Sequence, residues 1–217
     1  MRRIHPIRGR EMRRTKEEAE QTRTAILDVA EHIFAEKGVS SASLESISRA
    51  AGVTRGAFYW HFKDKTDLLT ALRARRLLPQ EGILAMAAEQ GYDDPLGLLE
   101  AAGHEMLAIF EVDESQQRMF RILSHMVEDE ETARCIRDIN NQMFELLRRI
   151  ARQARSNGTL SPDFTPEEAA VLMMSTMHGL LSEWLRSAKA FPLSVLGWKI
   201  LSSQMSLLRG CENARRP

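Results

Sequence analysis

The sequence predicts an all-α protein, and three observations lead to this expectation. Apolar residues recur at spacings of three and four, as at Ile26, Ala30 and Ile33, which is the pattern of a helix with one buried face. Residues that start and stop helices bound most of these segments. In addition, no stretch alternates apolar and polar residues over the length of a strand. We therefore expect helices throughout and no sheet.

Three helices are predicted in the first third of the chain. Thr15 and Glu18 form a capping box that starts a helix over residues 15–37, because the hydroxyl and the carboxylate satisfy two backbone donors reciprocally. Two short helices follow, over about residues 44–51 and 55–61, each with a hydroxyl side chain at its N-cap position. Residues 1–14 show no periodicity and hold six Arg and one Glu, so we expect a disordered basic arm.

The rest of the chain is predicted to be helical as well. The expected helices cover about residues 65–91, 95–111, 115–125, 130–157, 166–188 and 192–209. The first of these would connect the two parts of the chain, but it contains Pro79, so we expect a kink or a break there. Asp94-Pro95 and Thr165-Pro166 each supply a cap followed by a first-turn proline.

Composition excludes several classes of protein. With 43% hydrophobic and 28% charged residues, the 217-residue chain is globular rather than disordered. Its two cysteines, Cys135 and Cys211, form no CxxC pair, which argues against a disulfide framework or a zinc finger and makes a reducing cytoplasm the expected location. No apolar run approaches the roughly 18 residues of a membrane span, and the first residues lack the apolar core of a signal peptide.

The formal net charge of zero hides an asymmetry along the chain. Residues 1–76 hold 16 Lys and Arg against 10 Asp and Glu, whereas the remainder holds 14 against 20. A basic first third joined to an acidic remainder suggests that the N-terminal part binds a polyanion. A random scatter of charges is the alternative reading.

Residues 43–65, SLESISRAAGVTRGAFYWHFKDK, carry the most specific signal. Two short helices joined by a tight turn that contains glycine match the helix-turn-helix layout. Phe58 and Phe62 would pack the second helix onto the first. The residues left pointing outward, with a guanidinium and two amphipathic rings but no acid, would be Arg55, Gly56, Tyr59, Trp60 and His61. Such a surface suits a negatively charged groove. The alternative is that Tyr59 and Trp60 are half-buried packing residues.

This segment resembles the recognition signature of the TetR family of transcriptional regulators. The likeness runs almost position by position through GVTRGAFYWHF, continues at Lys65 and Leu68-Leu69, and covers residues 15–72 in detail. The tail Phe-Tyr-x-His-Phe-x-x-Lys is not shared by other helix-turn-helix motifs. The segments RRTKEEAEQTRTAIL and TRGAFYWHFKDK are most similar to the branch that represses multidrug efflux operons.

The resemblance implies a role for each matching position. Arg55 and Gly56 would reach base edges at the start of the recognition helix, Arg55 through bidentate bonds to a guanine. Trp60 would lie against the DNA backbone or a thymine methyl group. Phosphate contacts would come from Ser43, Thr54, Tyr59, His61 and Lys65. The basic arm would either follow DNA into an adjacent minor groove or stay solvated, and both readings remain open.

The resemblance further implies that residues 15–64 are the DNA-binding domain and residues 65–217 a domain for ligand binding and dimerisation. The last two predicted helices are each apolar over more than one face, which exceeds what one helix pair buries. A symmetric interface of four helices would cover the surplus. The predicted dimer contacts are Leu180, Trp184, Leu201 and Met205. The alternative is that all these faces point into one internal core.

A ligand site is expected among the middle helices, where Met and Phe are frequent and polar groups are few. Flexible thioethers suit ligands of varied apolar shape. The predicted contacts are Met106, Phe110, Phe120, Ser124, Met143, Met174, Met177 and His178, with His125 and Met126 as further candidates. His178 interrupts an apolar helix and is either a hydrogen-bonded core residue or a polar contact of the ligand.

No motif indicates an enzyme, a cofactor or a metal. The patterns GxGxxG, GxxxxGK[ST], GxSxG and HExxH are absent. A metal sensor would need Cys135 with His104, His125 or His178, and none of these pairs has a convincing ligand spacing. We therefore expect no catalytic activity, no cofactor and no metal site.

Together, the residues and the resemblance predict a cytoplasmic, ligand-responsive repressor that binds a palindromic operator as a homodimer. Its target would be a multidrug efflux operon, and small apolar, amphipathic or aromatic molecules would release it from DNA. A metabolic operon as the target, and an activator in place of a repressor, are the alternatives.

Overall fold

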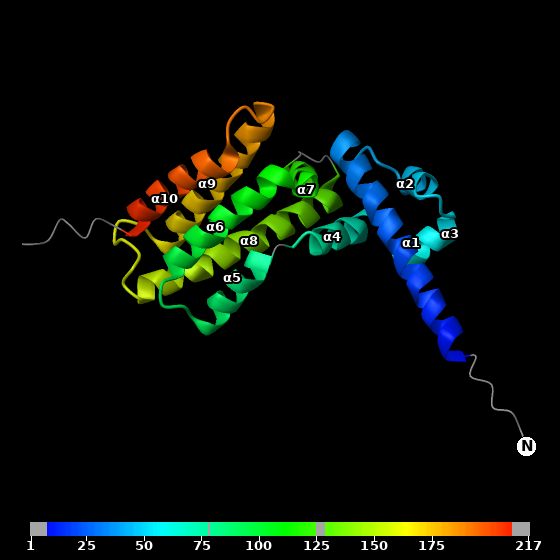
Figure 1. Ribbon diagram of the computed structural model, residues 1–217, viewed down its shortest axis with the longest axis horizontal. Helices are drawn as coiled ribbons and strands as arrows, with labels where there is room; N and C mark the ends of the chain where they lie inside the picture. The colour runs from blue at the N-terminus through cyan, green and yellow to red at the C-terminus, as the bar shows by residue number, and fades with distance from the viewer. Residues whose placement is uncertain (1–7, 78, 125–128, 210–217) are drawn as a thin grey trace, which may run out of the picture. The chain divides into compact units, whose positions relative to one another are not determined.

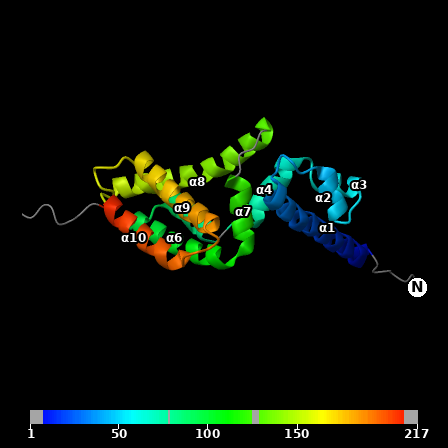
Figure 2. The same ribbon diagram turned by 90° about the horizontal axis from the view of Figure 1, so that it is seen from above.

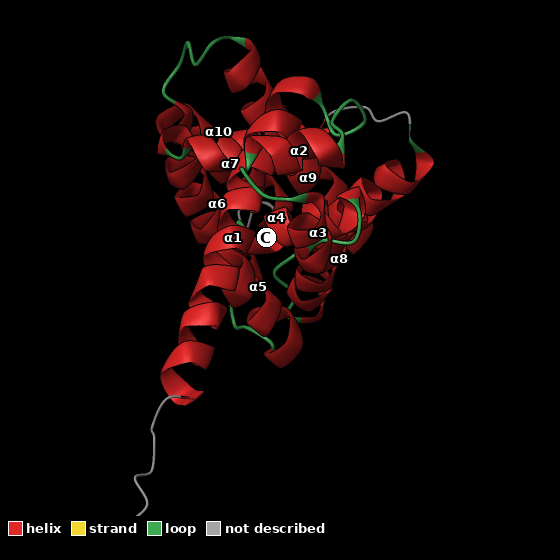
Figure 3. Cartoon of the chain, turned by 90° about the vertical axis from the view of Figure 1, so that its right-hand side faces the viewer, coloured by secondary structure: helices red, strands yellow, loops and turns green. Residues whose placement is uncertain are grey.

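The computed structural model describes residues 8–77, 79–124 and 129–209, and within these ranges every regular element is an α-helix (Figures 1 and 3). The predicted all-α fold class is therefore confirmed. The helices are α1 (Arg8–Lys37), α2 (Leu44–Ala50), α3 (Arg55–His61), α4 (Lys65–Arg75), α5 (Pro79–Gln90), α6 (Pro95–Val112), α7 (Glu114–Ser124), α8 (Glu130–Ser156), α9 (Pro166–Arg186) and α10 (Leu193–Arg209).

The chain folds into two compact units. Unit 1 comprises Met1–Arg76 with Arg118–Ile136, and unit 2 comprises Leu77–Gln117 with Arg137–Pro217. Helices α7 and α8 each contribute residues to both units. Helix α4 belongs to unit 1, and the division into functional domains between residues 64 and 65 stays a prediction.

Unit 1 is organised around α1. Helices α2 and α4 pack against it, and α2 packs against α3 (Figure 2). Most of the predicted apolar stripe of α1, including Ile26 and Ala30, is buried together with Ile47, Phe58 and Phe62, whereas Ile33 is only half-buried. Each large apolar side chain taken out of water in this way stabilises the fold by about 1.5–3 kcal/mol. The small core of unit 1 therefore holds α3 by its aromatic face.

Unit 2 is built on α6, α8, α9 and α10. Helix α10 packs against both α6 and α9, and α5 packs against α6. The α6–α10 contact is close at Gly197, where an added Cβ would lie 2.7 Å from a methyl carbon of Leu107. Helix α8 contributes Ile150, Ala151 and Ala154 to the core, all of them fully buried. This core consists mainly of Leu, Ile, Ala and Met side chains, with Phe144 and Phe164 packed against it.

The helix starts predicted at two proline-containing segments are present. Asp94 caps α6 by accepting a hydrogen bond from Gly97 N at 2.9 Å. At α9, Thr165 Oγ1 accepts from Glu168 N at 3.2 Å, and the Glu168 carboxylate accepts from Thr165 N at 2.7 Å, which completes a capping box. These hydrogen bonds hold the pKa of Glu168 below its usual value.

The start of α1 differs from the prediction. Helix α1 begins at Arg8, so the Thr15 capping box does not start it, and residues 8–14 of the predicted disordered arm are helical. Glu11, Met12 and Arg13 have high helix propensity, and a single Thr costs too little to stop a helix that continues on both sides. Residues 1–7 of the arm lie outside the described part of the chain, as do His125, Met126 and Cys211.

The break predicted at Pro79 is present. Helix α4 ends at Arg75 and α5 begins at Pro79, because a proline lacks the N–H of a helix interior and fits best in a first turn. The expected long connecting helix from residue 65 is therefore wrong, since α4 has only 11 residues. Within the described ranges, no helix is both long and apolar enough to cross a membrane.

A carboxylate from α6 caps the start of α10. Glu111 accepts hydrogen bonds from Leu193 N at 2.8 Å and from Ser194 N at 3.2 Å, although it lies 82 residues earlier in the chain. Hydrogen bonds from Ser194 are the main reason that the pKa of Glu111 is lowered. The positive end of the helix dipole favours the same charge. Glu111 thus ties the end of α6 to the beginning of α10.

We expect Glu111→Ala to reduce the free energy of unfolding by about 1 kcal/mol at pH 7, because two backbone donors lose their acceptor. A depressed folded-state pKa stabilises the fold above the unfolded carboxyl pKa of about 4.3, and this stabilisation is lost as the pH falls through the folded value. Urea unfolding of both proteins should therefore show a difference that is constant near neutral pH and shrinks below about pH 4. Equal stabilities at pH 7 would contradict the capping role.

Candidate DNA-binding interface and ligand-binding body

The turn between α2 and α3 sets the direction of α3. Gly52 has a φ of +69°, and Val53 N donates to Ser48 O at 3.0 Å, so the chain leaves α2 through a left-handed residue. Thr54 then caps α3 by accepting from Ala57 N at 3.1 Å. Ser43 caps α2 in the same way, accepting from Ser46 N at 3.0 Å. Both hydroxyl N-caps predicted from the sequence are present.

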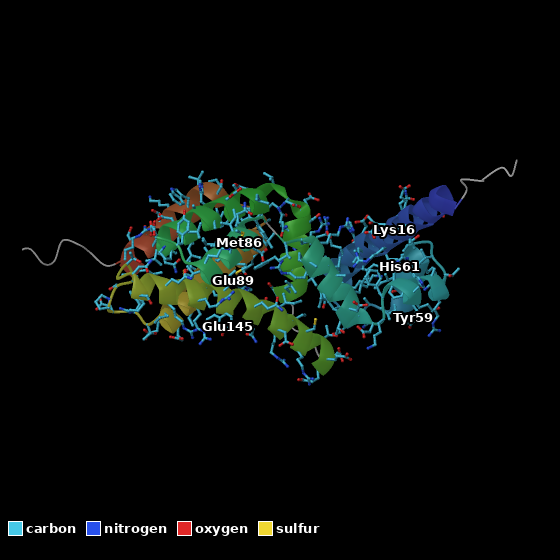
Figure 4. All side chains as sticks on the ribbon, turned by 90° about the horizontal axis from the view of Figure 1, so that it is seen from below. Lys16, Tyr59, His61, Met86, Glu89 and Glu145 are labelled. Atoms are coloured by element: carbon cyan, nitrogen blue, oxygen red, sulfur yellow. The ribbon has the colours of Figure 1, made fainter. Side chains whose placement is uncertain are left out.

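Helix α3 has one buried face and one exposed face. Phe58 and Phe62 are buried, whereas Tyr59 is 46% exposed and Trp60 is 73% exposed. The alternative that these two rings are half-buried packing residues does not hold for Trp60. Figure 4 labels Tyr59 on this helix, with Lys16 on α1 of the same unit. Large aromatic side chains on the open face of a seven-residue helix are suited to contact with another molecule.

Charged and hydroxyl groups surround the start of α3. The Arg55 guanidinium lies 5.6 Å from the centre of the Tyr59 ring, so the two side chains support each other on the exposed face. A surface cavity of about 430 Å³ lies beside them, lined by residues 40–45, Ser48, Arg55, Phe58, Tyr59 and Lys65. Hydroxyl, phenol and guanidinium groups around one hollow are the donors that bind DNA phosphates.

His61 ends α3 in a partly buried position. The Trp60 ring packs edge-on against it at 4.6 Å, and Arg23 of α1 lies 5.2 Å from the neighbouring Phe62 ring. Burial and then the positive charge of Arg23 lower the pKa of His61, while Glu20 opposes them. In the DNA-free protein these surroundings therefore favour the neutral form of the ring.

Lys65 is placed differently from its predicted phosphate-binding role. Its ammonium group donates to Val39 O at 3.1 Å and to Ser40 O at 2.9 Å, in the loop that follows α1. Helix α1 ends at Lys37 and is followed by Gly38 with a φ of +78°, so the ammonium binds carbonyl groups just beyond a helix C-terminus. Two of its three donors therefore hold the fold of unit 1 together. Sequence spacing gave no signal for these bonds, because the partners are 25 and 26 residues away.

The residues predicted to bind a ligand are divided between the two units. Phe120 and Ser124 belong to unit 1, and the other six belong to unit 2. Phe110 is buried and packs edge-on against Trp184 at 5.9 Å, while Met143 and Met174 are partly buried against the unit 2 core. Met106 and Met177 are likewise half-buried.

The sequence left two interpretations of His178 open, a core residue or a contact of the ligand. His178 is exposed on α9, so the interpretation of this residue as a core histidine is wrong. Sequence pattern suggested burial because the helix around it is apolar, but His178 occupies the face that turns outward. A contact with a ligand stays a prediction.

Three of the four predicted dimer residues are placed inside unit 2. Trp184, Leu201 and Met205 are buried, and Trp184 Nε1 donates to Phe191 O at 2.9 Å. Buried side chains cannot form a contact surface, so their assignment to an interface is corrected. Leu180 is half-buried and stays a candidate.

Each of the last two helices also has an exposed stripe. The α10 stripe consists of Leu196, Ile200 and Leu207, at spacings of four and seven. The α9 stripe consists of Val171 and the small residues Ser175 and Gly179, at spacings of four. Trp198 is also exposed and packs on His104 of α6 at 4.6 Å. Each helix therefore buries one apolar stripe in unit 2 and presents another. The sequence pattern showed two stripes but did not tell which one faces inward.

Among the described residues, no three His, Cys, Asp or Glu side chains lie close enough together to hold a metal ion. Cys135 lies beside Thr70 of α4, with 3.8 Å between the sulfur and Oγ1. Two other surface features remain. In unit 1, hydroxyl, phenol and guanidinium donors that could bind an anion line the cavity beside α3. In unit 2, apolar side chains are exposed on α10.

A capped α2, a glycine turn and an α3 that is anchored by two rings and exposes Arg, Tyr and Trp define a helix-turn-helix DNA-binding regulator. A model of bacterial regulatory proteins of the tetR family matches residues 26–72, and a model of the C-terminal region of MAATS-type transcriptional repressors matches residues 94–209. The chain belongs to the TetR family of transcriptional regulators.

Individual relatives match almost the whole chain. The HTH-type transcriptional repressor BepR of Brucella suis is 37% identical over 206 residues, which covers 93% of this chain and 99% of BepR. The crystal structure of NalD, the secondary repressor of the MexAB-OprM multidrug efflux pump in Pseudomonas aeruginosa, has a TM-score of 0.73 at 35% identity and covers 87% of this chain and 95% of its own. A complex of SmeT with triclosan has a TM-score of 0.72 at 27% identity, over 91% and 99% of the two chains.

We expect Lys65→Met to lower the free energy of unfolding by about 1–3 kcal/mol, because two carbonyl groups lose a charged donor. Lys63→Met is the matched control, since Lys63 is an exposed lysine two residues earlier and should leave stability unchanged. Urea unfolding of both variants measures the difference. The structural role of Lys65 would be contradicted by a fully stable Lys65→Met protein that only loses about 0.9 in the log–log salt slope of DNA binding.

Proposed function

We propose that this protein is a ligand-responsive repressor of a multidrug efflux operon, acting in the cytoplasm as a dimer on a palindromic operator. The exposed face of α3 is the observation that supports it most directly. The full-length likeness to BepR, and the description of NalD as a repressor of a multidrug efflux pump, support the choice of target.

In this proposal α3 enters the major groove. Arg55 forms bidentate bonds to a guanine, and Gly56 lets the DNA approach closely, since nothing in the chain lies within 4 Å of its Cβ position. Trp60 packs on the sugar-phosphate backbone or a thymine methyl group. Phosphates are bound by Ser43 and Tyr59, which line the cavity beside Arg55, and by Thr54 and His61 at the two ends of α3. Lys65 lines the same cavity, where two of its donors bind the carbonyls of Val39 and Ser40 and the third is available for a phosphate.

Dimerisation through α9 and α10 follows from their exposed stripes. Unit 2 exposes Leu196, Ile200 and Leu207 on α10 and the small residues of α9, which permit close helix approach. A two-fold axis would bury both stripes at once, against the same stripes of a second copy. Such a dimer presents two α3 helices, and a palindrome offers its half-sites about 34 Å apart along one DNA face.

The inducer is an apolar or amphipathic small molecule bound in unit 2. Four half-buried methionines, Met106, Met143, Met174 and Met177, supply adaptable surface on α6, α8 and α9. The complex of SmeT with triclosan supports an aromatic, weakly polar ligand. Occupancy favours an arrangement in which the two α3 helices no longer match the half-sites, and DNA is released.

We expect the wild-type protein to bind operator DNA from its own promoter region and to be released by compounds of a panel of dyes, antibiotics and phenols that includes triclosan. Inducer affinities should lie near a Kd of about 1 μM, because apolar area without many hydrogen bonds gives modest, broad binding. Fluorescence anisotropy of labelled operator measures both steps. If operator binds and no compound releases it, the ligand-responsive part of the proposal fails.

Arg55→Ala is the control for that experiment. It should weaken operator binding by about 1–3 kcal/mol per half-site and relax the preference at one base pair, while tryptophan fluorescence still reports inducer binding to the DNA-free protein. Loss of inducer binding in this variant would instead indicate a general folding defect.

We expect Ile200→Asp to convert the dimer into a monomer, because it places an unpaired charge in the buried interface. Ile83→Asp on α5 is the matched control, since Ile83 is 53% exposed and Ile200 is 38% exposed in the single chain. Light scattering should give about twice 24.7 kDa for wild type and for the control, and 24.7 kDa for Ile200→Asp. A monomeric wild type at micromolar concentration would contradict the proposed dimer.

A further inference from the structure

One buried carboxylate in unit 1 binds two arginines from distant parts of the chain. Glu31 on α1 is 1% exposed, and its Oε2 accepts from Arg76 Nη2 at 2.6 Å and from Arg76 Nε at 3.0 Å. Its Oε1 accepts from Arg118 Nε at 2.8 Å. One oxygen thus serves the residue after α4, and the other serves α7. We call these three residues the Glu31 cluster.

The two arginines stand where the chain passes between the units. Arg76 is the last residue of unit 1 before the chain enters unit 2, and Arg118 is the first residue after the chain returns. The chain passes between the units three times. At two of these passages, the residue on the unit 1 side binds Glu31 of α1. An ion pair in the middle of a domain would not have this property.

Within α7, the residues on both sides of the boundary between the units form side-chain hydrogen bonds. Gln117, the last residue of unit 2 in this segment, donates from its buried side-chain amide to Phe110 O at 2.8 Å, at the end of α6. Arg118, the next residue, binds Glu31 in unit 1. The residue that binds the end of α6 and the residue that binds Glu31 on α1 are thus joined by one peptide bond. No flexible linker intervenes at this crossing, because both residues are inside α7.

Because Glu31 is buried, we expect the cluster to fix the positions of the helices more than it increases the free energy of unfolding. A buried ion pair gains little over well-packed apolar residues, since desolvation offsets the Coulomb attraction. It is specific, however, because each carboxylate oxygen must meet its guanidinium with good geometry to compensate for the lost water. A change that moves Arg118 away leaves a partly unpaired carboxylate, so the cluster favours one arrangement of α7 on α1.

We propose that Glu31 is the positioning residue through which inducer binding in unit 2 is coupled to DNA binding by unit 1. The cluster holds the α7 position that operator binding requires, and the inducer-bound protein gives up the Arg118–Glu31 contact. This inference rests on the proposed function as a ligand-released repressor.

The test is Glu31→Gln in the full-length protein, which keeps the shape and removes the charge. The probe is the compound of the panel that releases the most wild-type operator, with its Kd measured on DNA-free protein. Because the variant loses the preference for the operator-binding arrangement, inducer Kd should fall by about fivefold or more while operator Kd rises. Opposite shifts distinguish coupling from a folding defect, which would weaken both.

A neighbouring ion pair provides the matched control. Arg75 and Asp28 join the same two helices, α4 and α1, with 2.7 Å between charged atoms, but they are more exposed and do not involve α7. Asp28→Asn should leave both dissociation constants unchanged. Arg118→Gln, which removes only the α7 contact, should shift both constants in the direction of Glu31→Gln, and the double variant should add no further shift.

A second measurement needs no small molecule. Hydrogen exchange of the operator-bound protein should show the amides of α7 opening at least about tenfold faster in Glu31→Gln than in wild type or Asp28→Asn. Unchanged exchange in α7, or dissociation constants that move in the same direction, would overturn the role of Glu31. If no compound releases wild-type DNA, the proposed function fails, and hydrogen exchange alone then decides whether the cluster holds α7.

Discussion

The structure of unit 1 depends on α1, which supports the DNA-facing helix with one face and receives ionic contacts with another. Ile26, Ala30 and Phe34 line the buried stripe and, together with Phe58 and Phe62, anchor α3. Because Phe58 of α3 and Phe62, the residue after it, are both buried, Tyr59 and Trp60 between them lie on the exposed side of the helix. Exposure of the recognition surface is thus a consequence of packing on the opposite side of the helix.

Local signals predicted most of the fold. Caps, first-turn prolines and apolar spacing predicted nine helical segments, one of them broken at Pro79 into α4 and α5, and most ends lie within two residues of those observed. The exception at α1 has a physical cause, because Thr15 forms a good cap only where the preceding residues do not themselves favour a helix. The exposed face of α3 was also predictable, because two buried Phe rings four residues apart determine which side of such a short helix faces the core.

Tertiary contacts of single polar side chains were not predictable. Lys65 binds carbonyl groups 25 and 26 residues away, and Arg118 binds Glu31 over 87 residues. A charged residue in a sequence looks solvated until the fold supplies a partner, so a basic residue near a recognition helix reads as a phosphate contact. The prediction of the dimer residues was wrong for a related reason. Periodicity identifies two apolar stripes on α10, but packing against α6 determines that the stripe with Leu201 and Met205 is internal.

Unit 2 differs between its helix ends and its middle. At the ends, polar side chains bind the backbone: Gln153 donates to the carbonyls of Ala87 and Ala88, Asn157 donates to Tyr92 O, and Arg155 donates to Ser161 O at 3.0 Å. Between the ends the side chains are mostly apolar, although Gln204 donates to Thr176 Oγ1 between α10 and α9. Methionine side chains among them can change conformation at low cost. If the proposed function holds, fixed helix ends keep unit 2 folded while its apolar middle adapts to ligands of different shape. DNA phosphates, in contrast, have a fixed spacing, and the α3 surface that meets them is held by a small core that includes Phe58.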